Sequence, residues 1–386
     1  MDIQLTCPMS GKRWVFTGGA CAEGGFAQNQ GFRAATGHFE EVIRWTARID
    51  GDLASRENYV FNTAGSGYSV CDILRMFDDR IARFRPAAVV YITGQEDRLL
   101  SPQTYREGLA ELQRQTEALG AIFFVLQDGD PLAQAGCLLE TIGGAALPEN
   151  LLDRAQLALE PSAEILPRSG SLRLSSEAMR WLFIGDSITH GALHTHGYDS
   201  LPQLWEKYLR GDWGRRDDMV LNTAVSGATA KEHLERLDIR YTPYADADVV
   251  IAMFGTNDCC FPDTITPEQF REHLRTIVDL AHAHGSQAVL RTPQPQLPEA
   301  VSRARAIVPF VEIVREVAQE KGTLLVDHFS SFTALQQAHP ARFRALMGDA
   351  VHPNAQGQYR MFREMAYALD MVLENSMATL DYPPAD

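Results

Sequence analysis

The feature that most constrains this chain is an internal repeat that keeps its order over four segments. The matches are WVFTGGACAEG (14–24) with WLFIGDSITHG (181–191), FNTAGSG (61–67) with LNTAVSG (221–227), PAAVVYITGQED (86–97) with ADVVIAMFGTND (247–258), and SPQTYREGL (101–109) with TPEQFREHL (266–274). The second member of each pair follows the first by 167, 160, 161 and 165 residues, so only loop lengths differ. Ordered self-similarity indicates one structural unit that occurs twice. We therefore predict a tandem duplication.

Within each copy, short apolar or β-branched runs alternate with segments of helical periodicity. In the second copy the predicted strands are 180–186, 218–224, 247–254, 287–292 and 323–328. The predicted helices are about 199–210, 229–240, 266–284, 298–321 and 355–375. This alternation predicts an α/β fold with a parallel sheet covered on both faces. Runs such as VVIAMF and AIFFVL are almost uniformly apolar, which fits strands buried on both sides.

The two copies are separated by a segment rich in glycine and proline, residues 131–178. We place the boundary near 169–176, which gives a first domain at 1–170 and a second at 171–386.

Composition limits the function classes. The 386 residues include 35 Lys+Arg and 50 Asp+Glu, and a net charge of −15 argues against nucleic acid or an anionic membrane as the main partner. No apolar run is long enough to span a bilayer, and the first residues show no secretory signal. Six cysteines without a CxxC pair are too few for a disulfide scaffold. We expect a cytoplasmic protein of undetermined oligomeric state.

Four polar segments of the second copy follow its predicted strands. Ser187 comes directly after the first strand, where open α/β sheets place ligands, although a serine there can also cap a helix. Asp349 precedes His352 by three residues, which lets the carboxylate bond one ring nitrogen, although such a pair can also be a surface turn. Gly227 permits close backbone approach to a ligand, and Asn257 offers N–H donors. Together they supply the nucleophile, base, orienting acid and oxyanion donors that acyl transfer needs.

These segments resemble the SGNH hydrolases, which are the GDSL-like esterases and lipases. The resemblance covers about residues 178–375 and rests on GDSIT at 185–189, NTAVSG at 222–227, GTND at 255–258 and DAVHP at 349–353. It implies two tandem three-layer α/β/α flavodoxin-like domains. It also implies hydrolysis of an ester or thioester through an acyl-enzyme, with no metal or other cofactor.

The resemblance implies a role for each matched residue. Ser187 would be the nucleophile, His352 the general base and then acid, and Asp349 the residue that orients the imidazole. The backbone N–H groups of Ser187 and Gly227 and the side chain of Asn257 would form the oxyanion hole.

Residues beside the motifs are further candidates. Three of them are expected to contact substrate: Asp186, Asp258 and Cys259. His190, His194 and His196 have a spacing that could suit a metal, but no acidic or cysteine ligand accompanies them in sequence. We therefore expect no metal site.

The first copy lacks the chemistry of the second. In the register of the repeat, Ala20 stands for Ser187 and Glu96 for Asn257, and no D-x-x-H-P motif follows residue 130 in that half. Alanine cannot attack a carbonyl, and an ionised Glu96 would repel an oxyanion. We expect an inactive domain that supports the second one, walls its cleft, or binds a carbohydrate or protein partner.

The expected activity is hydrolysis of short acyl esters, with O-deacetylation of a carbohydrate or glycoside as the leading case. The expected partner is thus a small-molecule or glycan ester. No long apolar lid of the kind that a lipase at an interface needs is visible. Thioesterase or lysophospholipase activity and acyl transfer to a sugar hydroxyl are alternatives. A non-catalytic binding or assembly protein is the alternative of another class.

Overall fold

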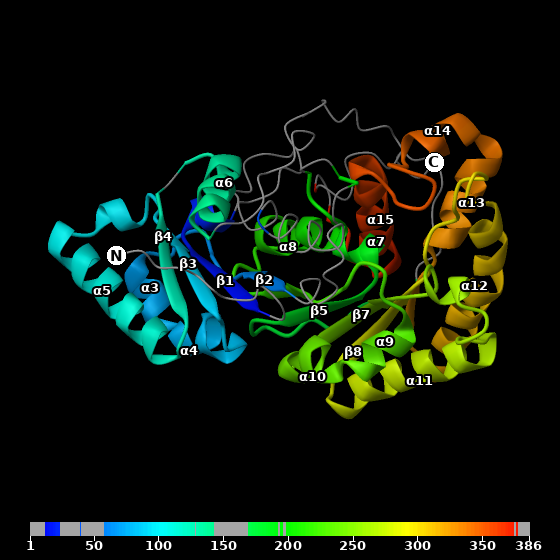
Figure 1. The fold of residues 1–386 in the computed structure, drawn as a ribbon, viewed down its shortest axis with the longest axis horizontal. Coiled ribbons are helices and arrows are strands. Elements are labelled where there is room, and N and C mark those ends of the chain that lie inside the picture. Colours follow the sequence, from blue (N-terminus) through cyan, green and yellow to red (C-terminus); the bar gives the residue numbers. More distant parts are fainter. Residues whose placement is uncertain are drawn as a thin grey trace. The chain divides into compact units, whose positions relative to one another are not determined.

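A computed structural model describes residues 12–23, 39, 58–127, 129–142, 169–191, 194–195, 198–373 and 376 (Figure 1). The chain divides into two compact units, Met1–Arg154 and Ala155–Asp386, and each is described by itself. The division falls within 143–168, which lies outside the described residues, and the boundary at residue 170 stays a prediction. Over the described ranges, no helix has the length and apolarity needed to span a bilayer.

The second unit is built on a five-stranded parallel sheet with the order β6-β5-β7-β8-β9. The strands are β5 Arg180–Gly185, β6 Met219–Asn222, β7 Val249–Met253, β8 Gln287–Arg291 and β9 Leu324–Val326. Each lies within its predicted range, so the predicted α/β class with a parallel sheet is confirmed. The central strand β7 is buried at every position, as its apolar sequence requires.

Helices follow the strands in alternation. They are α7 Ser187–His190, α8 Leu201–Gly211, α9 Ala230–Glu235, α10 Leu237–Arg240, α11 Pro267–Ala283, α12 Val301–Lys321, α13 His328–Ala338, α14 Pro340–Ala345 and α15 Ala355–Ala368, with the 3-10 turns η5 Thr242–Tyr244 and η6 Asp258–Cys260. Local sequence sets several of their starts. The Thr266 hydroxyl accepts the N–H of Gln269, and Pro267 fits the first turn of α11.

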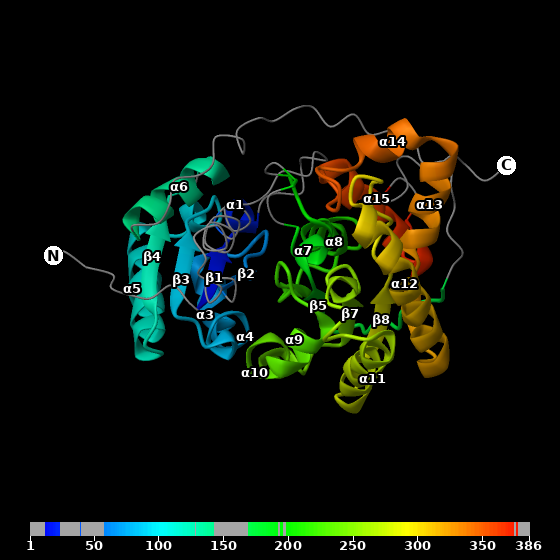
Figure 2. The same cartoon turned by 45° about the vertical axis from the view of Figure 1, so that its right-hand side comes forward.

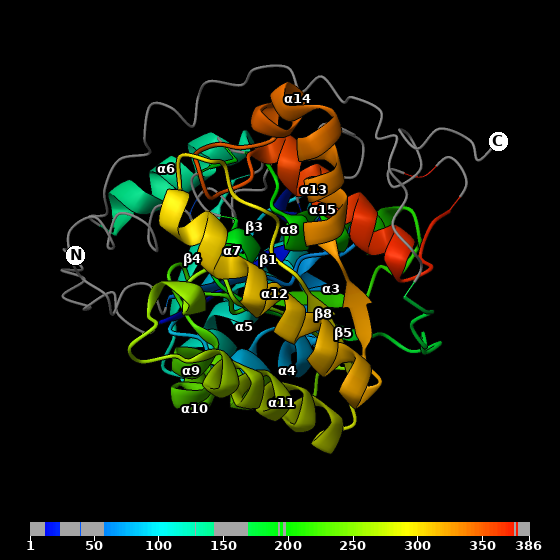
Figure 3. The ribbon, with the colours of Figure 1, turned by 90° about the vertical axis from the view of Figure 1, so that its right-hand side faces the viewer.

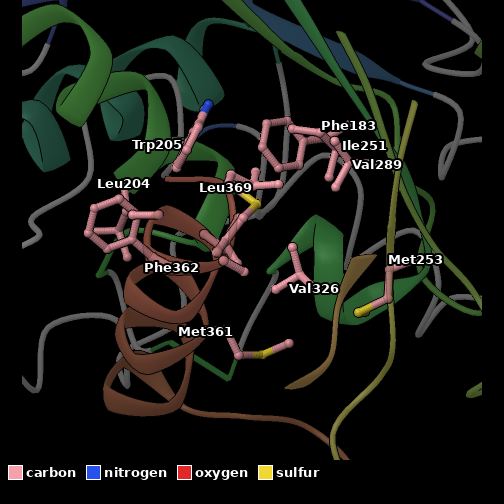
Figure 4. Close-up of a cluster of buried hydrophobic side chains, with 14 of the residues drawn as sticks. Phe183, Leu204, Trp205, Ile251, Met253, Val289, Val326, Met361, Phe362 and Leu369 are labelled. Atoms are coloured by element: carbon pink, nitrogen blue, oxygen red, sulfur yellow. The ribbon is translucent and has the colours of Figure 1, made fainter. Parts of the chain in front are cut away.

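The sheet of the second unit lies between two layers of helices, with α8 and α15 on one face and α11 and α12 on the other (Figure 3). Side chains of a strand alternate between the faces. Phe183 of β5 and Ile251 of β7 therefore meet Trp205 of α8 and Phe362 of α15 in one cluster (Figure 4). Trp181 joins the same cluster, with its ring centroid 5.7 Å from that of Trp205. This core holds the helices α8 and α15 against the sheet.

The first unit contains a four-stranded parallel sheet with the order β2-β1-β3-β4. Its elements are β1 Arg13–Gly18, α1 Ala20–Glu23, β2 Tyr59–Asn62, α3 Val70–Arg75, α4 Phe77–Arg80, η2 Ala82–Phe84, β3 Ala88–Ile92, η3 Asp97–Leu99, α5 Pro102–Ala118, β4 Ile122–Leu126 and α6 Pro131–Thr141. Helix α6 packs on one face through Leu138 and Leu139, against Trp14 and Val90. Helices α3 and α5 pack together against the sheet, with α5 beside β4 (Figure 2).

The two sheets share their strand order over the first four strands of each unit. The registers also correspond. Trp14 of β1 pairs with Ala88 of β3, and Trp181 of β5 pairs with Val249 of β7. The first three matched segment pairs therefore contain strands at the same positions in the two sheets, and the fourth pair begins the helices α5 and α11.

Several helices differ from their predicted ranges. The predicted helix 229–240 is two helices, because the backbone at Arg236 leaves the helical region (φ −122°, ψ 32°). Helix α15 ends at Ala368 instead of residue 375, and Asp370 adopts a left-handed φ of 58°. Helix α6 lies inside the segment predicted as a linker. Helices α13 and α14 were not predicted, because their sequences are weakly periodic and they depend on burying residues such as Phe332 and Phe343.

A core substitution tests this packing. Ile251→Ala should lower the free energy of unfolding by about 2–5 kcal/mol, because it leaves a cavity in the central strand. Urea denaturation followed by tryptophan fluorescence measures the change. Val308→Ala, at a side chain that is 43% exposed on α12, is the matched control and should shift stability by no more than about 0.5 kcal/mol. Equal effects of the two variants would contradict the proposed core.

Candidate active site

Ser187 lies at the carboxyl end of β5, as the first residue of α7. The turn that presents it requires glycine at the preceding strand end. Gly185 has a φ of 156°, and a Cβ there would lie 2.6 Å from the carbonyl oxygen of Met253. Strand β5 can therefore approach β7 closely before the chain turns. Ser187 is 5% exposed, so only a small part of its surface is open.

Asp349 and His352 lie on a tight loop before α15, and an antiparallel bridge closes the ends of this loop. The N–H of Gly348 donates to the carbonyl of His352 at 2.8 Å. Asp349 Oδ1 accepts the backbone N–H groups of Val351 and His352, each at 2.7 Å. The carboxylate is thus fixed by backbone donors of its own loop, as short polar side chains commonly are in turns.

A hydrogen-bonded chain joins this loop to Ser187. His352 Nδ1 lies 2.8 Å from Asp349 Oδ2, and His352 Nε2 lies 2.9 Å from Ser187 Oγ. When the Nδ1–H donates to the carboxylate, Nε2 is left as the acceptor for the serine hydroxyl. We call these three residues the Ser–His–Asp chain. It is the arrangement in which an imidazole can deprotonate a hydroxyl.

The charge of Asp349 is stable in this setting. Burial raises the pKa of its carboxyl group, but the hydrogen bond and charge of His352 and the backbone donors outweigh burial and hold the pKa well below its usual range. Asp349 therefore stays ionised at neutral pH and can stabilise a positive charge on the imidazole.

Gly227 and Asn257 follow the strands on either side of β5, so the sheet order places their loops next to that of Ser187. Gly227 has a left-handed φ of 84°, which glycine adopts without strain. Asn257 Nδ2 donates to the carbonyl of Ala228 at 3.0 Å. This bond fixes the amide group and uses one of its two hydrogens, so the second can serve a ligand.

Asp186 and Asp258 do not lie where a substrate could contact them, because both are completely buried. Asp186 Oδ1 accepts the N–H of Ile188 at 2.9 Å. Asp258 accepts the N–H groups of Ala230 at 2.8 Å and Gly255 at 2.9 Å. Burial raises the pKa of Asp186 to about 6 and that of Asp258 to about 7. The prediction that Asp186 and Asp258 contact the substrate is therefore wrong. Their carboxyl groups instead bond the backbone of the loops after β5, β6 and β7.

Cys259 is also below the surface. It is 5% exposed, and its Sγ lies 3.4 Å from the carbonyl oxygen of Thr256 and 3.9 Å from Cys260 Sγ, so its one thiol proton has two possible acceptors. Ser187 has the same exposed fraction, and the expected contact of Cys259 with a substrate stays a prediction.

Arg291, which was not predicted as a site residue, ends strand β8 and is buried. Its Nε donates to His328 Nε2 at 3.1 Å. Burial lowers the pKa of Arg291 to about 9, while the charges of Asp186 and Glu364 oppose this shift. A buried positive charge thus lies near the buried Asp186. The only sequence signal is an arginine at the end of the apolar run AVLR.

Of the three histidines of the H-x3-H-x-H pattern, His190 and His194 are described, and they contact different residues. His190 Nδ1 lies 2.9 Å from Ser226 Oγ, and His196 lies outside the described residues. The ring of His194 stacks on that of His352, with centroids 4.0 Å apart and planes 5° from parallel. Its Nδ1 lies 3.7 Å from Asp349 Oδ2. The carboxylate thus faces two imidazoles.

Among the residues that the structure places, the ligand atoms of His194, Asp349 and His352 all lie within 4.8 Å of one another, so this group could hold a metal ion. The sequence pattern missed it because the acidic member comes from a distant loop. Two of the three residues already belong to the Ser–His–Asp chain, so a bound metal would compete with that chain.

The first unit places a carboxylate at the position equivalent to Asn257. Glu96 Oε1 accepts the N–H of Ala20 at 3.1 Å and the N–H of Gly67 at 3.0 Å. In the register of the sequence repeat, these two donors correspond to the N–H groups of Ser187 and Gly227. One carboxyl oxygen therefore accepts both donors in the first unit.

Comparison with solved structures finds similar α/β enzymes. LAE5, an alpha/beta hydrolase enzyme from the metagenome of Lake Arreo, is 25% identical, with a TM-score of 0.43 over 50% of this chain and 96% of its own. Axe2, an acetylxylan esterase from Geobacillus stearothermophilus, is 22% identical, with a TM-score of 0.43 over 52% of this chain and 96% of its own.

An uncharacterized protein of Mycoplasma pneumoniae is 42% identical over 110 residues, which are 28% of this chain. The chain spans about 12% of the length of that relative. The GDSL-like Lipase/Acylhydrolase family matches residues 183–360, a range that contains all three residues of the Ser–His–Asp chain. Over these residues, the chain carries the sequence pattern of the GDSL-like Lipase/Acylhydrolase family.

Proposed function

We propose that the second unit is a serine ester hydrolase that removes short acyl groups through an acyl-enzyme. The observation that carries this proposal is the Ser–His–Asp chain, in which Ser187 Oγ lies 2.9 Å from His352 Nε2 and His352 Nδ1 lies 2.8 Å from Asp349 Oδ2. These distances are within the range over which an imidazole can take a hydroxyl proton.

The proposed reaction has two halves. His352 takes the proton of Ser187 as the serine oxygen attacks the acyl carbonyl, and the imidazolium then gives that proton to the leaving alcohol. Water next attacks the acyl-enzyme, with His352 again as base, and the acid product leaves. Asp349 stays ionised and stabilises the imidazolium in both halves, because its pKa is held well below the usual range.

The oxyanion of each tetrahedral intermediate would be held by the backbone N–H groups of Ser187 and Gly227 and by Asn257 Nδ2. The first unit supports this assignment, because Glu96 Oε1 accepts the two equivalent backbone N–H groups there at 3.1 and 3.0 Å. A carboxylate oxygen bound to both donors is a close chemical stand-in for an oxyanion.

The proposed substrate is an acetyl ester of a carbohydrate or glycoside. Ser187 is 5% exposed and Asn257 is 8% exposed, so little of either side chain is open to solvent. Limited exposure of the nucleophile favours a short acyl group, while the alcohol half of the ester can extend into solvent.

We also propose that the chain is a tandem duplication, with an inactive first domain at 1–170 and the hydrolase at 171–386. The shared strand order and register of the two sheets support a common origin. Ala20 removes the nucleophile from the first domain, and Glu96 already occupies the donors that an oxyanion would need. We assign this first domain a supporting role in the structure.

Replacing the nucleophile tests the reaction type. Ser187→Ala should abolish both ester hydrolysis and covalent labelling by a serine-directed fluorophosphonate, because the attacking oxygen is gone. Gel fluorescence and intact mass measure the labelling. Ser302→Ala, at an exposed position of α12, is the matched control and should label like the unchanged protein. Labelling that persists in Ser187→Ala would refute the assignment, and no labelling of the unchanged protein would favour a binding protein.

The acyl chain tests the substrate class. Among p-nitrophenyl esters from acetyl to dodecanoyl, kcat/KM should be highest for acetyl, because little of the Ser187 side chain is open to solvent. Acetate release from an acetylated oligosaccharide, measured by an enzymatic acetate assay, should also occur. A maximum at the long chains would contradict the deacetylase proposal and favour a lipase-like activity.

Asn257 tests the oxyanion hole. Asn257→Ala should lower kcat by about 10²–10³-fold, because one donor to the oxyanion is lost. Asn257→Glu copies Glu96 of the first unit and should lower kcat further, because its carboxylate competes for the same donors and repels the oxyanion. Steady-state kinetics measure both, with the exposed Thr264→Ala as control. Activity in Asn257→Glu at or above that of Asn257→Ala would contradict this account.

A further inference from the structure

A pair of neighbouring thiols lies at the end of the loop that carries Asn257, within the 3-10 turn η6. Cys259 is buried, whereas Cys260 is partly exposed. Their sulfur atoms are 3.9 Å apart, which allows the thiol of one to donate to the sulfur of the other. Neither takes part in the proposed ester hydrolysis, so their arrangement calls for its own explanation.

A guanidinium group lies beside this pair. Arg303, in the first turn of α12, donates from Nε to Cys260 Sγ at 2.8 Å. No carboxylate among the described residues forms an ion pair with Arg303, so its polar contact is the sulfur atom. The positive end of the helix dipole of α12 lies at the same turn. An arginine in this position has a clear electrostatic partner only when the sulfur is a thiolate.

From this geometry we propose that Cys260 is a reactive thiolate and a site of covalent modification by small electrophiles, including hydrogen peroxide. Three features of the site combine: the guanidinium of Arg303, the thiol donor of Cys259, and partial exposure of Cys260 to solvent. Reactive cysteines generally lie in partly exposed, electropositive surroundings of this kind.

The titration of the pair agrees with the geometry. The hydrogen bond from Cys259 lowers the pKa of the Cys260 thiol to about 6, burial opposes this shift, and the charge of Arg303 adds to it. The same hydrogen bond raises the pKa of Cys259, with burial and the Asp258 carboxylate in the same direction. Cys260 is therefore the member of the pair that ionises, and Cys259 keeps its proton.

The reaction with peroxide is balanced without any further reagent. The Cys260 sulfur attacks one peroxide oxygen, an S–O bond forms as the O–O bond breaks, and the released hydroxide takes a proton to leave as water. Sulfur is oxidised to sulfenic acid, and the peroxide is reduced. Closure to a disulfide with Cys259 would be strained, because adjacent Cα atoms are about 3.8 Å apart and disulfides usually need about 4.4–6.8 Å. The sulfenic acid should therefore persist long enough to be trapped.

Modification would also reach the proposed oxyanion hole. The N–H of Cys260 donates to the carbonyl of Asn257 at 2.9 Å, so the two residues belong to one turn, and modification of Cys260 is expected to alter the position of Asn257. The experiments measure alkylation and oxidation of Cys260, not ester hydrolysis. A negative result would therefore contradict the reactive thiolate without contradicting the proposed hydrolase.

The first experiment measures alkylation of the full chain by iodoacetamide as a function of pH, with peptide mass spectrometry to assign each cysteine. Cys137, which is exposed in the first unit, is the matched reference thiol. The rate at Cys260 should reach half its maximum near pH 6 and at a lower pH than the rate at the reference thiol, because the pKa of Cys260 is lowered. Equal midpoints at the two cysteines would overturn the proposal.

Variants separate the two causes. Arg303→Gln should move the midpoint of Cys260 alkylation to higher pH. At about pH 6.5 the alkylation should slow by about five- to tenfold, because a smaller fraction of the thiol is ionised. The greater nucleophilicity of each remaining thiolate offsets only part of this loss. Arg303→Lys keeps the charge and should restore part of the rate. Cys259→Ser keeps a donor and should change the midpoint less than Cys259→Ala. No response to Arg303→Gln, in a protein with unchanged unfolding, would contradict the guanidinium–thiolate contact.

The second experiment exposes the protein to hydrogen peroxide in the presence of dimedone, which traps sulfenic acid. The dimedone adduct should form on Cys260 at least about fivefold faster than on Cys137 at neutral pH, because the attacking species is the thiolate. Arg303→Gln should remove most of this preference. An adduct that is absent from Cys260, or no faster there than on Cys137, would overturn the proposal.

Discussion

The hydrogen bond between Ser187 Oγ and His352 Nε2 joins residues that lie 165 positions apart in the chain, and the proposed chemistry depends on this contact. It forms because two independent parts of the second unit are held rigidly. Gly185 lets β5 end against Met253 before the chain turns to present Ser187. The loop before α15 is closed by its own backbone bonds, and the Asp349 carboxylate fixes the imidazole of His352. Because each partner is positioned by its own local structure, little reorganisation is needed when a proton moves.

The two units show how one sheet topology can carry different chemistry. In each unit an aspartate, Asp97 or Asp258, accepts two backbone N–H groups and so ties two loops together. Two other backbone N–H groups, of Ala20 and Gly67 in the first unit and of Ser187 and Gly227 in the second, stand at equivalent positions. In the first unit Glu96 accepts those donors. In the second unit Asn257 instead donates to Ala228, which leaves the equivalent backbone donors available to a ligand. In the proposed function, the exchange of an acceptor for a donor at this one position separates a self-occupied site from one that would stabilise an oxyanion.

The buried charged groups around the site follow from the same loops. Asp186 and Asp258 were expected at the substrate, but the structure buries both and bonds them to backbone N–H groups. Sequence position could not distinguish these functions, because a carboxylate beside a catalytic residue can face either the substrate or the loop below it. His194 presents a similar case, since its stacking on His352 comes from a loop whose own pattern indicates only a spacing of histidines. Such residues tune the site through contacts that no local motif encodes.

The amino-acid sequence predicted the parallel α/β class, the five strands of the second unit, and the segments of Ser187, Gly227 and Asn257 that follow three of those strands. It could do so because strand burial requires apolar runs, and because parallel strands bring their carboxyl ends to one edge. Other features could not be predicted: the helices α13 and α14, the split between α9 and α10, the burial of Asp186, Asp258 and Cys259, and the loop after α14 that brings His352 to Ser187. These features depend on packing between distant segments, which local periodicity does not record. The contact of Arg303 with Cys260 belongs to the same class, because a helix start and a strand-end turn meet there only after the sheet has formed.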